Sequence, residues 1–242
     1  YQFARLDRRV AIVTDSGVPE AYARRVADQC QDARIITVPQ GEASKSLKTL
    51  ETVLRQMLDF GMGRGDLVVA VGGVVGDLAG FAASIYMRGV DFINCPTTTL
   101  SMIDSSIGGK TAVDLGDTKN IVGTFWQPKL VIVDPDTLST LPHRHFVNGL
   151  AEAVKAALLA DPELFSIFEQ GDVDARIDEI IYRCLRFKKN IVEQDETEQG
   201  MRKALNFGHT LGHGIEAVRG IKGRRTTGLY HGECVALGML PM

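Results

Sequence analysis

The chain has 242 residues, of which 45% are hydrophobic and 24% charged, and its formal net charge at pH 7 is −3. A chain of this size can bury one large core or two modest ones, and we expect two lobes. The slightly negative charge offers no basic surface for nucleic acid and no attraction to anionic lipid. We therefore expect small-molecule or protein partners, no nucleic acid and no membrane.

The cysteines indicate a reducing compartment. Cys30, Cys95, Cys184 and Cys234 are far apart and include no C-x-x-C spacing, which is typical of reduced thiols. No signal peptide opens the sequence, and no apolar run approaches the length of a membrane span. We expect a soluble cytoplasmic protein.

The first half alternates strand and helix signals. Short apolar runs rich in β-branched residues predict strands, and segments with helical spacing follow the first two. The strands are predicted at residues 9–14, 34–38, 67–71, 91–95 and 129–134, and the helices at residues 19–30 and 46–60. Repeated strand-helix units predict an α/β lobe with a mostly parallel, Rossmann-like sheet.

The helix predicted at residues 46–60 has a clear apolar face. Its spacing places five large side chains together, namely Leu47, Leu50, Val53, Leu54 and Leu58. We expect this face to pack on the sheet.

A glycine-rich turn follows the strand at residues 67–71. It reads Gly72-Gly73-Val74-Val75-Gly76-Asp77 and leads into the small-residue stretch 78–85. Glycines between a strand and a helix let backbone N–H groups approach a phosphate. This turn is the expected cofactor cradle, although its spacing differs from the G-x-G-x-x-G fingerprint.

Lys110 follows Gly108 and Gly109 as the lysine of a P-loop would. A Walker A motif would need glycine at the position of Asp104. A nucleotide triphosphatase is therefore a poor interpretation.

From residue 142 the pattern becomes helical, with runs at residues 147–160, 162–169 and 177–192 and no convincing strand. We predict an α/β domain at residues 1–141 and an all-α domain at residues 142–242. Ligand sites often form in clefts between such lobes.

Three histidines and one glutamate in the helical half could bind a metal. His209 and His213 are four residues apart and share a helix face, and His231 follows a loop. Glu152 lies in an apolar segment, where a buried carboxylate needs a partner. Two histidines and one carboxylate suit a catalytic zinc site, but spacing does not decide which histidines bind.

Basic residues recur beside these candidates. Lys155 lies one helical turn after Glu152, and Lys188 and Arg202 flank the acidic segment 193–198. Their number favours an anionic substrate.

Together these segments resemble the 3-dehydroquinate synthase family over nearly the whole chain. The matching motifs are GGVVGDLAG, MRG, PTTTL, DSSIGGKTAV, KNIVGTFWQP, GLAEAVK, RKALNFGHTLGH and HGECVALGM. The resemblance implies a dehydroquinate synthase-like fold and an NAD- and metal-dependent lyase. It would convert 3-deoxy-D-arabino-heptulosonate 7-phosphate to 3-dehydroquinate and phosphate, the second step of the shikimate pathway, which leads to chorismate and the aromatic amino acids.

The implied reaction combines transient oxidation by NAD, β-elimination of phosphate, reduction and intramolecular aldol closure. The implied metal is zinc, with cobalt as an alternative, and the implied assembly is a homodimer.

The resemblance also assigns site residues. The metal ligands would be Glu152, His209 and His231. The cofactor-binding residues would be Asp15, Glu42, Lys45, Gly72, Gly73, Val74, Asp77, Thr97, Thr98, Lys119 and Thr140. The substrate-binding and catalytic residues would be Arg88, Asp104, Lys110, Asn120, Lys155, Lys188, Arg202, Asn206 and His213.

Two features depart from the family pattern. The family usually has three glycines after the third strand, whereas here Val71 precedes only two, so the turn is either one residue shorter or has a valine where glycine is usual. The family also has further helices beyond the position of Met242, including one with a substrate lysine, so we expect a sequence truncated at its C-terminus.

Three alternatives stay open. Another sugar phosphate cyclase, such as 2-deoxy-scyllo-inosose synthase, would act on a substrate without the carboxylate. A glycerol-dehydrogenase-like alcohol dehydrogenase would release NADH. A non-catalytic module would provide only a cofactor-binding or dimerisation surface.

Overall fold

The computed structural model describes residues 4–220 and 228–241. The chain packs as two compact units, one comprising Tyr1–Thr97 and Gly109–Asp134 and the other Thr98–Gly108 and Pro135–Met242. The domain boundary at residue 141 stays a prediction. By internal packing, the first change of unit comes earlier, at Thr98.

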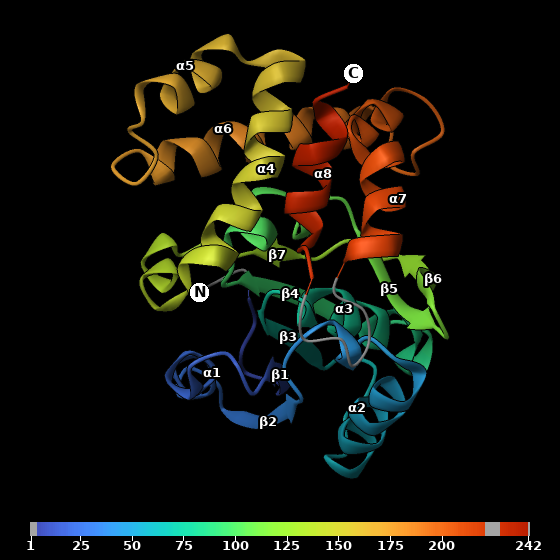
Figure 1. The fold of residues 1–242 in the computed structure, drawn as a ribbon. Coiled ribbons are helices and arrows are strands. Elements are labelled where there is room, and N and C mark those ends of the chain that lie inside the picture. The colour runs from blue at the N-terminus through green and yellow to red at the C-terminus, as the bar shows by residue number, and fades with distance from the viewer. Residues whose placement is uncertain (1–3, 221–227, 242) are drawn as a thin grey trace. The chain divides into compact units, whose positions relative to one another are not determined.

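The first unit contains the predicted parallel sheet. Its strand order is β2-β1-β3-β4-β7 (Figure 1). The strands are β1 (Arg9–Asp15), β2 (Asp32–Val38), β3 (Leu67–Gly72), β4 (Asp91–Pro96) and β7 (Leu130–Val131). β3 is buried along its whole length, as its continuous apolar run predicts. The last strand is shorter than predicted, because only Leu130 and Val131 pair with β4.

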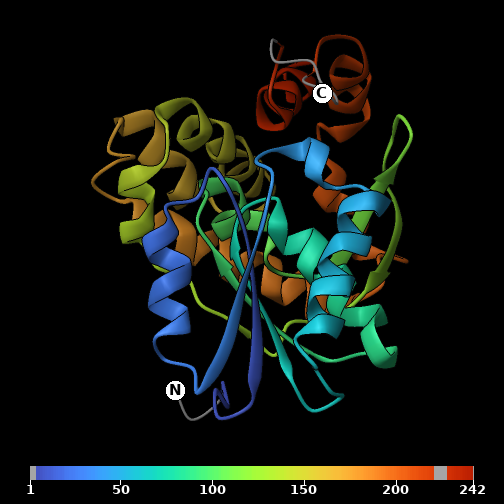
Figure 2. The same cartoon turned by 90° about the horizontal axis from the view of Figure 1, so that it is seen from below.

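Helices cover both faces of this sheet (Figure 2). The helices are α1 (Glu20–Ala27), α2 (Leu47–Asp59) and α3 (Val75–Ile85). Side chains of α1 pack with Val10, Ile12 and Val69 on one face of the sheet. Those of α2 and α3 pack with Ala11 and Val68 on the other. Alternate residues along β1 and β3 thus supply two separate cores.

The predicted apolar face of α2 was wrong in part. Leu50 and Val53 are buried as expected, but Leu47 is 44% exposed and Leu58 is 67% exposed. Met57 is fully buried instead. Met57 lies two turns after Leu50, so the buried stripe follows the i, i+3, i+7 positions.

A two-stranded antiparallel hairpin in the first unit was not predicted. It consists of β5 (Lys110–Leu115) and β6 (Thr118–Phe125). Val113 of β5 belongs to the same core as α2 and α3. Polar and glycine residues interrupt the period-two pattern of both strands, which hides them in the sequence.

The second unit is helical, as predicted. Its α-helices are α4 (His143–Ala160), α5 (Pro162–Gln170), α6 (Ile177–Gln194), α7 (His209–Arg219) and α8 (His231–Met239). Residues Ser101–Ser105 add a short π-helical turn. This turn and α8 both pack against α4, and Figure 1 shows α4 beside α8.

Two glycines let α7 and α8 approach closely. A Cβ atom on Gly212 of α7 would lie 3.1 Å from the Cα atom of Val235 in α8. A Cβ atom on Gly238 would collide with the backbone at Gly208 and Gly212. The close packing brings together the first residues of the two helices, His209 and His231, whose ring centroids are 5.4 Å apart.

Two sequence predictions concern membrane helices and disulfides. Among the described residues, no helix is both long and apolar enough to cross a bilayer. Cys30, Cys95, Cys184 and Cys234 all lie in the described part of the chain, and none of them forms a disulfide.

Candidate active site

The sheet of the first unit changes direction between β1 and β3. From β1 the chain proceeds outward to β2, then returns to β3 on the other side of β1 and continues to β4. In open α/β sheets, ligands bind beyond the carboxyl ends of the strands at such a switch point. Asp15 ends β1 and Gly72 ends β3, so two of the predicted cofactor residues lie there.

The turn after β3 is tight and accepts little side-chain volume. Gly72 has a φ of +152°, and a Cβ atom there would lie 2.6 Å from the Val75 side chain. Val74 is the N-cap residue of α3, and Gly73 accepts a hydrogen bond from the backbone N–H of Gly76. The turn therefore leads directly into a helix N-terminus, which suits a pyrophosphate.

The unusual Val71 lies outside this turn. Its side chain is 2% exposed and belongs to the core formed with α1.

Lys45 is the centre of a charged cluster in the first unit. Its side chain is 4% exposed, and Nζ lies 2.7 Å from Asp77 Oδ2 and 3.4 Å from Glu42 Oε1. Nζ also donates to Asn120 Oδ1. Burial disfavours the charge, but Asp77 and Glu42 outweigh it and raise the pKa of Lys45. Lys119 joins the cluster, with Nζ 3.9 Å from Glu42 Oε1.

Three metal candidates meet in the second unit. Glu152 is on α4 and 2% exposed, while His209 and His231 begin α7 and α8. Glu152 Oε1 lies 3.5 Å from His209 Nε2 and 3.7 Å from His231 Nε2. Ligand atoms about 2.0–2.1 Å from a tetrahedral metal stand about 3.3 Å apart, so these separations fit one ion.

Hydrogen bonds fix the two imidazoles in a suitable tautomer. His209 Nδ1 lies 3.1 Å from the backbone oxygen of Phe207, and His231 Nδ1 lies 3.1 Å from Glu216 Oε2. Both oxygens can only accept, so each Nδ1 carries the hydrogen and each Nε2 has a lone pair for a metal.

The surroundings of the Glu152 carboxylate are a second indication that a cation can bind here. Neither of its buried oxygens makes a hydrogen bond of good geometry. Oε1 faces the two histidines, whereas Oε2 forms an ion pair with Lys155. An anion buried this deeply needs more positive charge than one lysine shared with other groups.

The pKa values of the metal candidates follow from their surroundings. Burial lowers the pKa of His209. Burial also opposes the charge on His231, but the nearby carboxylates of Glu152 and Glu216 outweigh it and raise the pKa of His231 to about 9. Burial raises and the cationic neighbours lower the pKa of Glu152, with a net decrease. Without a metal, His231 therefore supplies positive charge to Glu152.

A small cavity in the second unit joins several predicted substrate residues. It is lined in part by Asp104, Glu152, Lys155 and Lys188. Lys188 Nζ lies 2.8 Å from Asp104 Oδ1. Burial raises the pKa of Asp104, but Lys188 and Lys155 outweigh it and hold that pKa well below its usual range. Within the cavity each lysine is paired with a carboxylate, Lys155 with Glu152 and Lys188 with Asp104.

Arg202 is held by backbone oxygens. It is 1% exposed, and its guanidinium donates to Gly108 O at 2.9 Å and to Glu196 O. His213 lies nearer the metal candidates, with its ring centroid 5.3 Å from that of His209 and 6.0 Å from that of His231.

Other predicted residues lie at exposed positions or away from these clusters. Asn206 is exposed and donates to Glu198 Oε1 at 3.0 Å. Arg88 and Lys110 are exposed positions of the first unit. Thr97 belongs to the first unit, whereas Thr98 and Thr140 belong to the second. Thr98 bonds with Ser101, and Thr140 donates to Thr137 O.

Two residues that support the metal candidates were missed in the sequence. Glu216 bonds to His231, and Asn148 of α4 accepts a 2.8 Å hydrogen bond from the backbone of Gly232 at the start of α8. Glu216 lies seven residues after His209, on the same face of α7, and that spacing could have identified it. Asn148 had no comparable signal.

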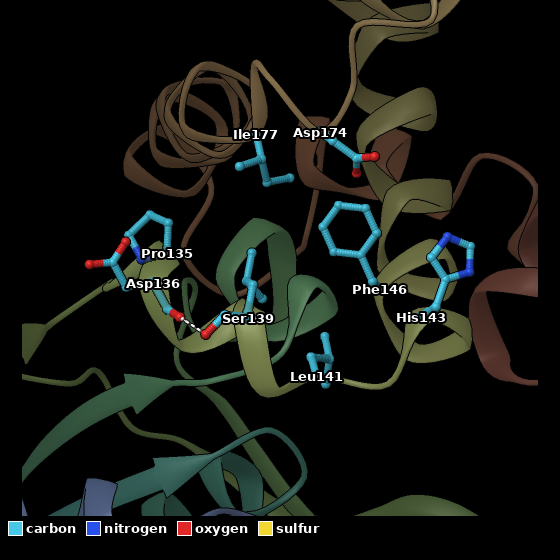
Figure 3. Close-up of a pocket in the computed structure, with 9 residues that line it drawn as sticks. Pro135, Asp136, Ser139, Leu141, His143, Phe146, Asp174 and Ile177 are labelled. Atoms are coloured by element: carbon cyan, nitrogen blue, oxygen red, sulfur yellow. Dashed lines mark hydrogen bonds between the residues drawn. The ribbon is translucent and has the colours of Figure 1, made fainter.

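A separate hollow in the second unit contains none of these residues. The segment 135–141 and the starts of α4 and α6 line it, with Leu141, Phe146 and Ile177 as apolar members and Asp136 and Asp174 as acidic ones (Figure 3).

A second set of possible metal ligands overlaps the first. His213, Glu216 and His231 also bring ligand atoms within 4.8 Å of one another. Both sets contain His231, and a given nitrogen of its ring can bind only one metal ion at a time. The hydrogen bond from His231 Nδ1 to Glu216 favours the set that contains Glu152.

Two family models match adjoining parts of the sequence. Residues 35–148 match the 3-dehydroquinate synthase N-terminal model, and residues 149–241 match the 3-dehydroquinate synthase C-terminal model. A 3-dehydroquinate synthase of Pelobacter propionicus is 43% identical over 246 residues, which cover 97% of this chain and 67% of that protein. The chain thus spans about two thirds of the length of this relative.

Solved structures of two cyclases share the fold. A 2-epi-5-epi-valiolone synthase from Streptomyces hygroscopicus, with NAD⁺ and Zn²⁺ bound, is 31% identical, with a TM-score of 0.85 over 96% of this chain and 67% of that one. A 2-deoxy-scyllo-inosose synthase complexed with carbaglucose-6-phosphate, NAD⁺ and Co²⁺ is 29% identical, with a TM-score of 0.82 over 96% of this chain and 66% of that one.

Proposed function

The chain belongs to the 3-dehydroquinate synthase family, and from this membership we propose its reaction and the residues that carry it. The protein converts 3-deoxy-D-arabino-heptulosonate 7-phosphate to 3-dehydroquinate and phosphate, as an NAD- and metal-dependent lyase of the shikimate pathway. Identity supports this substrate over those of the related cyclases, since it is 43% to the dehydroquinate synthase and 29–31% to the two cyclases of solved structure.

The observation that carries this proposal is the buried Glu152 carboxylate. It faces two correctly oriented imidazoles on one side and Lys155 on the other. A metal ion bound at the imidazoles would therefore lie close to Lys155, which we assign to the substrate.

We assign Glu152, His209 and His231 as the metal ligands. When bound, the metal acidifies a substrate hydroxyl, and NAD⁺ accepts and later returns a hydride. Glu216 keeps the His231 ring in its orientation through Nδ1. Zinc is the proposed ion, because the related valiolone synthase was solved with Zn²⁺. Cobalt is the alternative, because the inosose synthase was solved with Co²⁺.

We assign the cofactor to the carboxyl end of the first unit's sheet. The α3 N-terminus binds the pyrophosphate, and the turn at Gly72 lets it approach the backbone. Asp15 stands at the end of β1, where a carboxylate can accept hydrogen bonds from a ribose. The cofactor-binding residues are Asp15, Glu42, Lys45, Gly72, Gly73, Val74, Asp77, Thr97, Thr98, Lys119 and Thr140.

The substrate is bound by cations and hydrogen-bond donors. Lys155 and Lys188 lie in the cavity beside Glu152, where they can orient the substrate's anionic groups. Asp104 keeps Lys188 in place. The proposed substrate-binding and catalytic residues are Arg88, Asp104, Lys110, Asn120, Lys155, Lys188, Arg202, Asn206 and His213.

The cellular setting is also a proposal. The four cysteines, none of which forms a disulfide, suit a reducing cytoplasm. The family resemblance suggests a homodimer. Light scattering of the purified protein tests the dimer, and a monomer at working concentration would contradict it.

Phosphate release from the heptulosonate phosphate tests the proposed function. The full-length protein should release phosphate only with NAD⁺ and metal, stop when the metal is chelated, and accumulate no NADH. Net NADH would indicate an alcohol dehydrogenase. Turnover of glucose 6-phosphate in place of the heptulosonate would indicate an inosose-type cyclase. No turnover of either sugar phosphate would favour a non-catalytic module.

A further inference from the structure

The β5–β6 hairpin has an irregularity opposite Asp114. The pairing register shifts between Val113 and Leu115, where Asp114 alone on β5 faces Lys119, Asn120 and Ile121 on β6, so the bulge lies in β6 around Asn120. Bulges of this kind redirect a side chain and often lie beside functional sites. Asp114 also forms an isolated parallel bridge with Ser46, outside the hairpin. Asp114, opposite the bulge, thus connects the hairpin to the segment that carries Lys45.

Three hydrogen bonds close a ring among Asp114, Asn120 and Lys45. The Asp114 backbone N–H donates to Lys45 O at 2.8 Å. The Asp114 carboxylate accepts the backbone N–H of Asn120 at 2.8 Å. The Asn120 side-chain oxygen then accepts from Lys45 Nζ. Each member of the ring is therefore held by the other two.

The ring imposes an uncommon backbone conformation. Asn120 has a φ of +55°, which is in the left-handed region. Asparagine tolerates this region better than most residues, but it still needs local support. The Asp114 carboxylate supplies that support, because it binds the N–H of the left-handed residue itself.

We propose that Asp114 is a positioning residue of the cofactor-binding cluster. Through the left-handed turn it sets the Asn120 amide against Lys45, and through its own backbone it anchors the Lys45 segment. This inference rests on the proposed function, which assigns Lys45 to the cofactor and Asn120 to the substrate. Asp114 itself needs no contact with either ligand.

The neighbouring Asp117 provides a matched control. It lies between the same two strands and is exposed. If the carboxylate served only the hairpin's solubility or charge, the two aspartates would be interchangeable. The ring predicts that only Asp114 matters.

The test compares Asp114→Ala, Asp114→Asn and Asp117→Ala in the full-length protein. Calorimetric titration with NAD⁺ should show affinity about tenfold weaker for Asp114→Ala, the usual effect of one lost hydrogen bond to a charged group. Asp114→Asn keeps an acceptor for the Asn120 N–H, so its affinity should stay within about threefold of wild type. Asp117→Ala should bind as the wild type does. If Asp114→Ala does not fold, Asp114→Ser replaces it, because its shorter side chain removes the acceptor from reach.

A second readout does not depend on the cofactor. Amide hydrogen exchange at Asn120, measured by NMR without ligand, should accelerate in Asp114→Ala and stay slow in Asp114→Asn. Unchanged exchange at Asn120 would overturn the hydrogen-bond ring. Wild-type NAD⁺ affinity in Asp114→Ala would overturn the positioning role. Failure of the wild type to bind NAD⁺ would contradict the proposed function, and the exchange measurement would still decide the ring.

Discussion

Each unit has a charged cluster around a buried side chain, Lys45 in the first unit and Glu152 in the second, and the two charges are neutralised differently. Lys45, 4% exposed, has two carboxylates and an amide oxygen around its ammonium group. Glu152, 2% exposed, has one lysine and two imidazoles, and neither of its oxygens makes a good hydrogen bond. The first charge has hydrogen-bonded partners within the protein. The second has ion-pair partners but no hydrogen bond of good geometry.

This difference has an energetic basis. A buried charge costs several kcal/mol unless partners and hydrogen bonds replace its water. Lys45 has these partners at all times, so its cluster can form a rigid part of the cofactor site. Glu152 gains them when a metal binds, so metal binding should stabilise the second unit as well as activate it.

The largest expected effect comes from removing a metal ligand. His209→Ala should abolish stoichiometric zinc binding and phosphate release, because two ligands hold a catalytic ion poorly. Elemental analysis and the phosphate assay measure both. The matched control is His213→Ala on the same helix, which should keep zinc but lose turnover.

The opposite result in these two variants would assign the metal to the other set of ligands. If His213→Ala loses the metal and His209→Ala keeps it, the ion is bound by the set that contains His213, Glu216 and His231.

Lys110→Ala should lower kcat/KM for the heptulosonate phosphate by about a hundredfold, as loss of a charged donor to a transition state does. Its NAD⁺ affinity should be unchanged, because Lys110 is assigned to the substrate. Lys48→Ala, at another exposed position of the first unit, is the control. A full rate in Lys110→Ala would show that this side chain has no part in the reaction.

Removing the Glu216 side chain that holds the His231 ring is expected to have an intermediate effect on zinc binding. Glu216→Ala removes the acceptor at His231 Nδ1 and should weaken zinc binding by about 10- to 100-fold. Glu216→Gln keeps an oxygen acceptor and should lose less. Competition with a zinc chelator measures the affinities, with the exposed Glu169→Gln as control. Equal affinity in Glu216→Ala and wild type would remove Glu216 from the site.

The smallest expected effect concerns pH. In the metal-free protein the pKa of His231 is raised from its ordinary 6.5 to about 9, because Glu152 and Glu216 outweigh the effect of burial. A raised pKa stabilises the folded state fully below pH 6.5, and this contribution is lost as pH rises through about 9. The Tm of chelated wild type should therefore fall over this interval more steeply than that of His231→Gln. Parallel curves for the two proteins would contradict the raised pKa.

The sequence predicted the elements better than their side-chain environment. The strand runs at residues 9–14 and 67–71 are found as β1 and β3, because long β-branched runs have few other stable states. On α2, Leu58 and Met57 are adjacent and similarly apolar, so only the packed sheet decides which is buried. The β5–β6 hairpin was missed because its glycine and polar residues carry no regular pattern.

The candidate site was also predicted only in part, because motifs identify residues but not their tertiary contacts. Motifs could name Glu152, His209 and His231, and the structure places them within reach of one ion. The ring that contains Asp114 depends on a bulge and on a contact between segments some 70 residues apart, Lys45 and Asp114. Such contacts arise from tertiary packing and leave no periodic signal in the sequence.

The most direct test of the Glu152 cluster is thermal unfolding of wild type and Glu152→Gln, each with chelator and with zinc. The metal-free variant should be less stable than metal-free wild type, because glutamine leaves the buried Lys155 without its carboxylate partner. Zinc should raise the Tm of wild type and leave that of Glu152→Gln unchanged. An equal zinc-dependent rise in both proteins would contradict the assignment of Glu152 as a metal ligand.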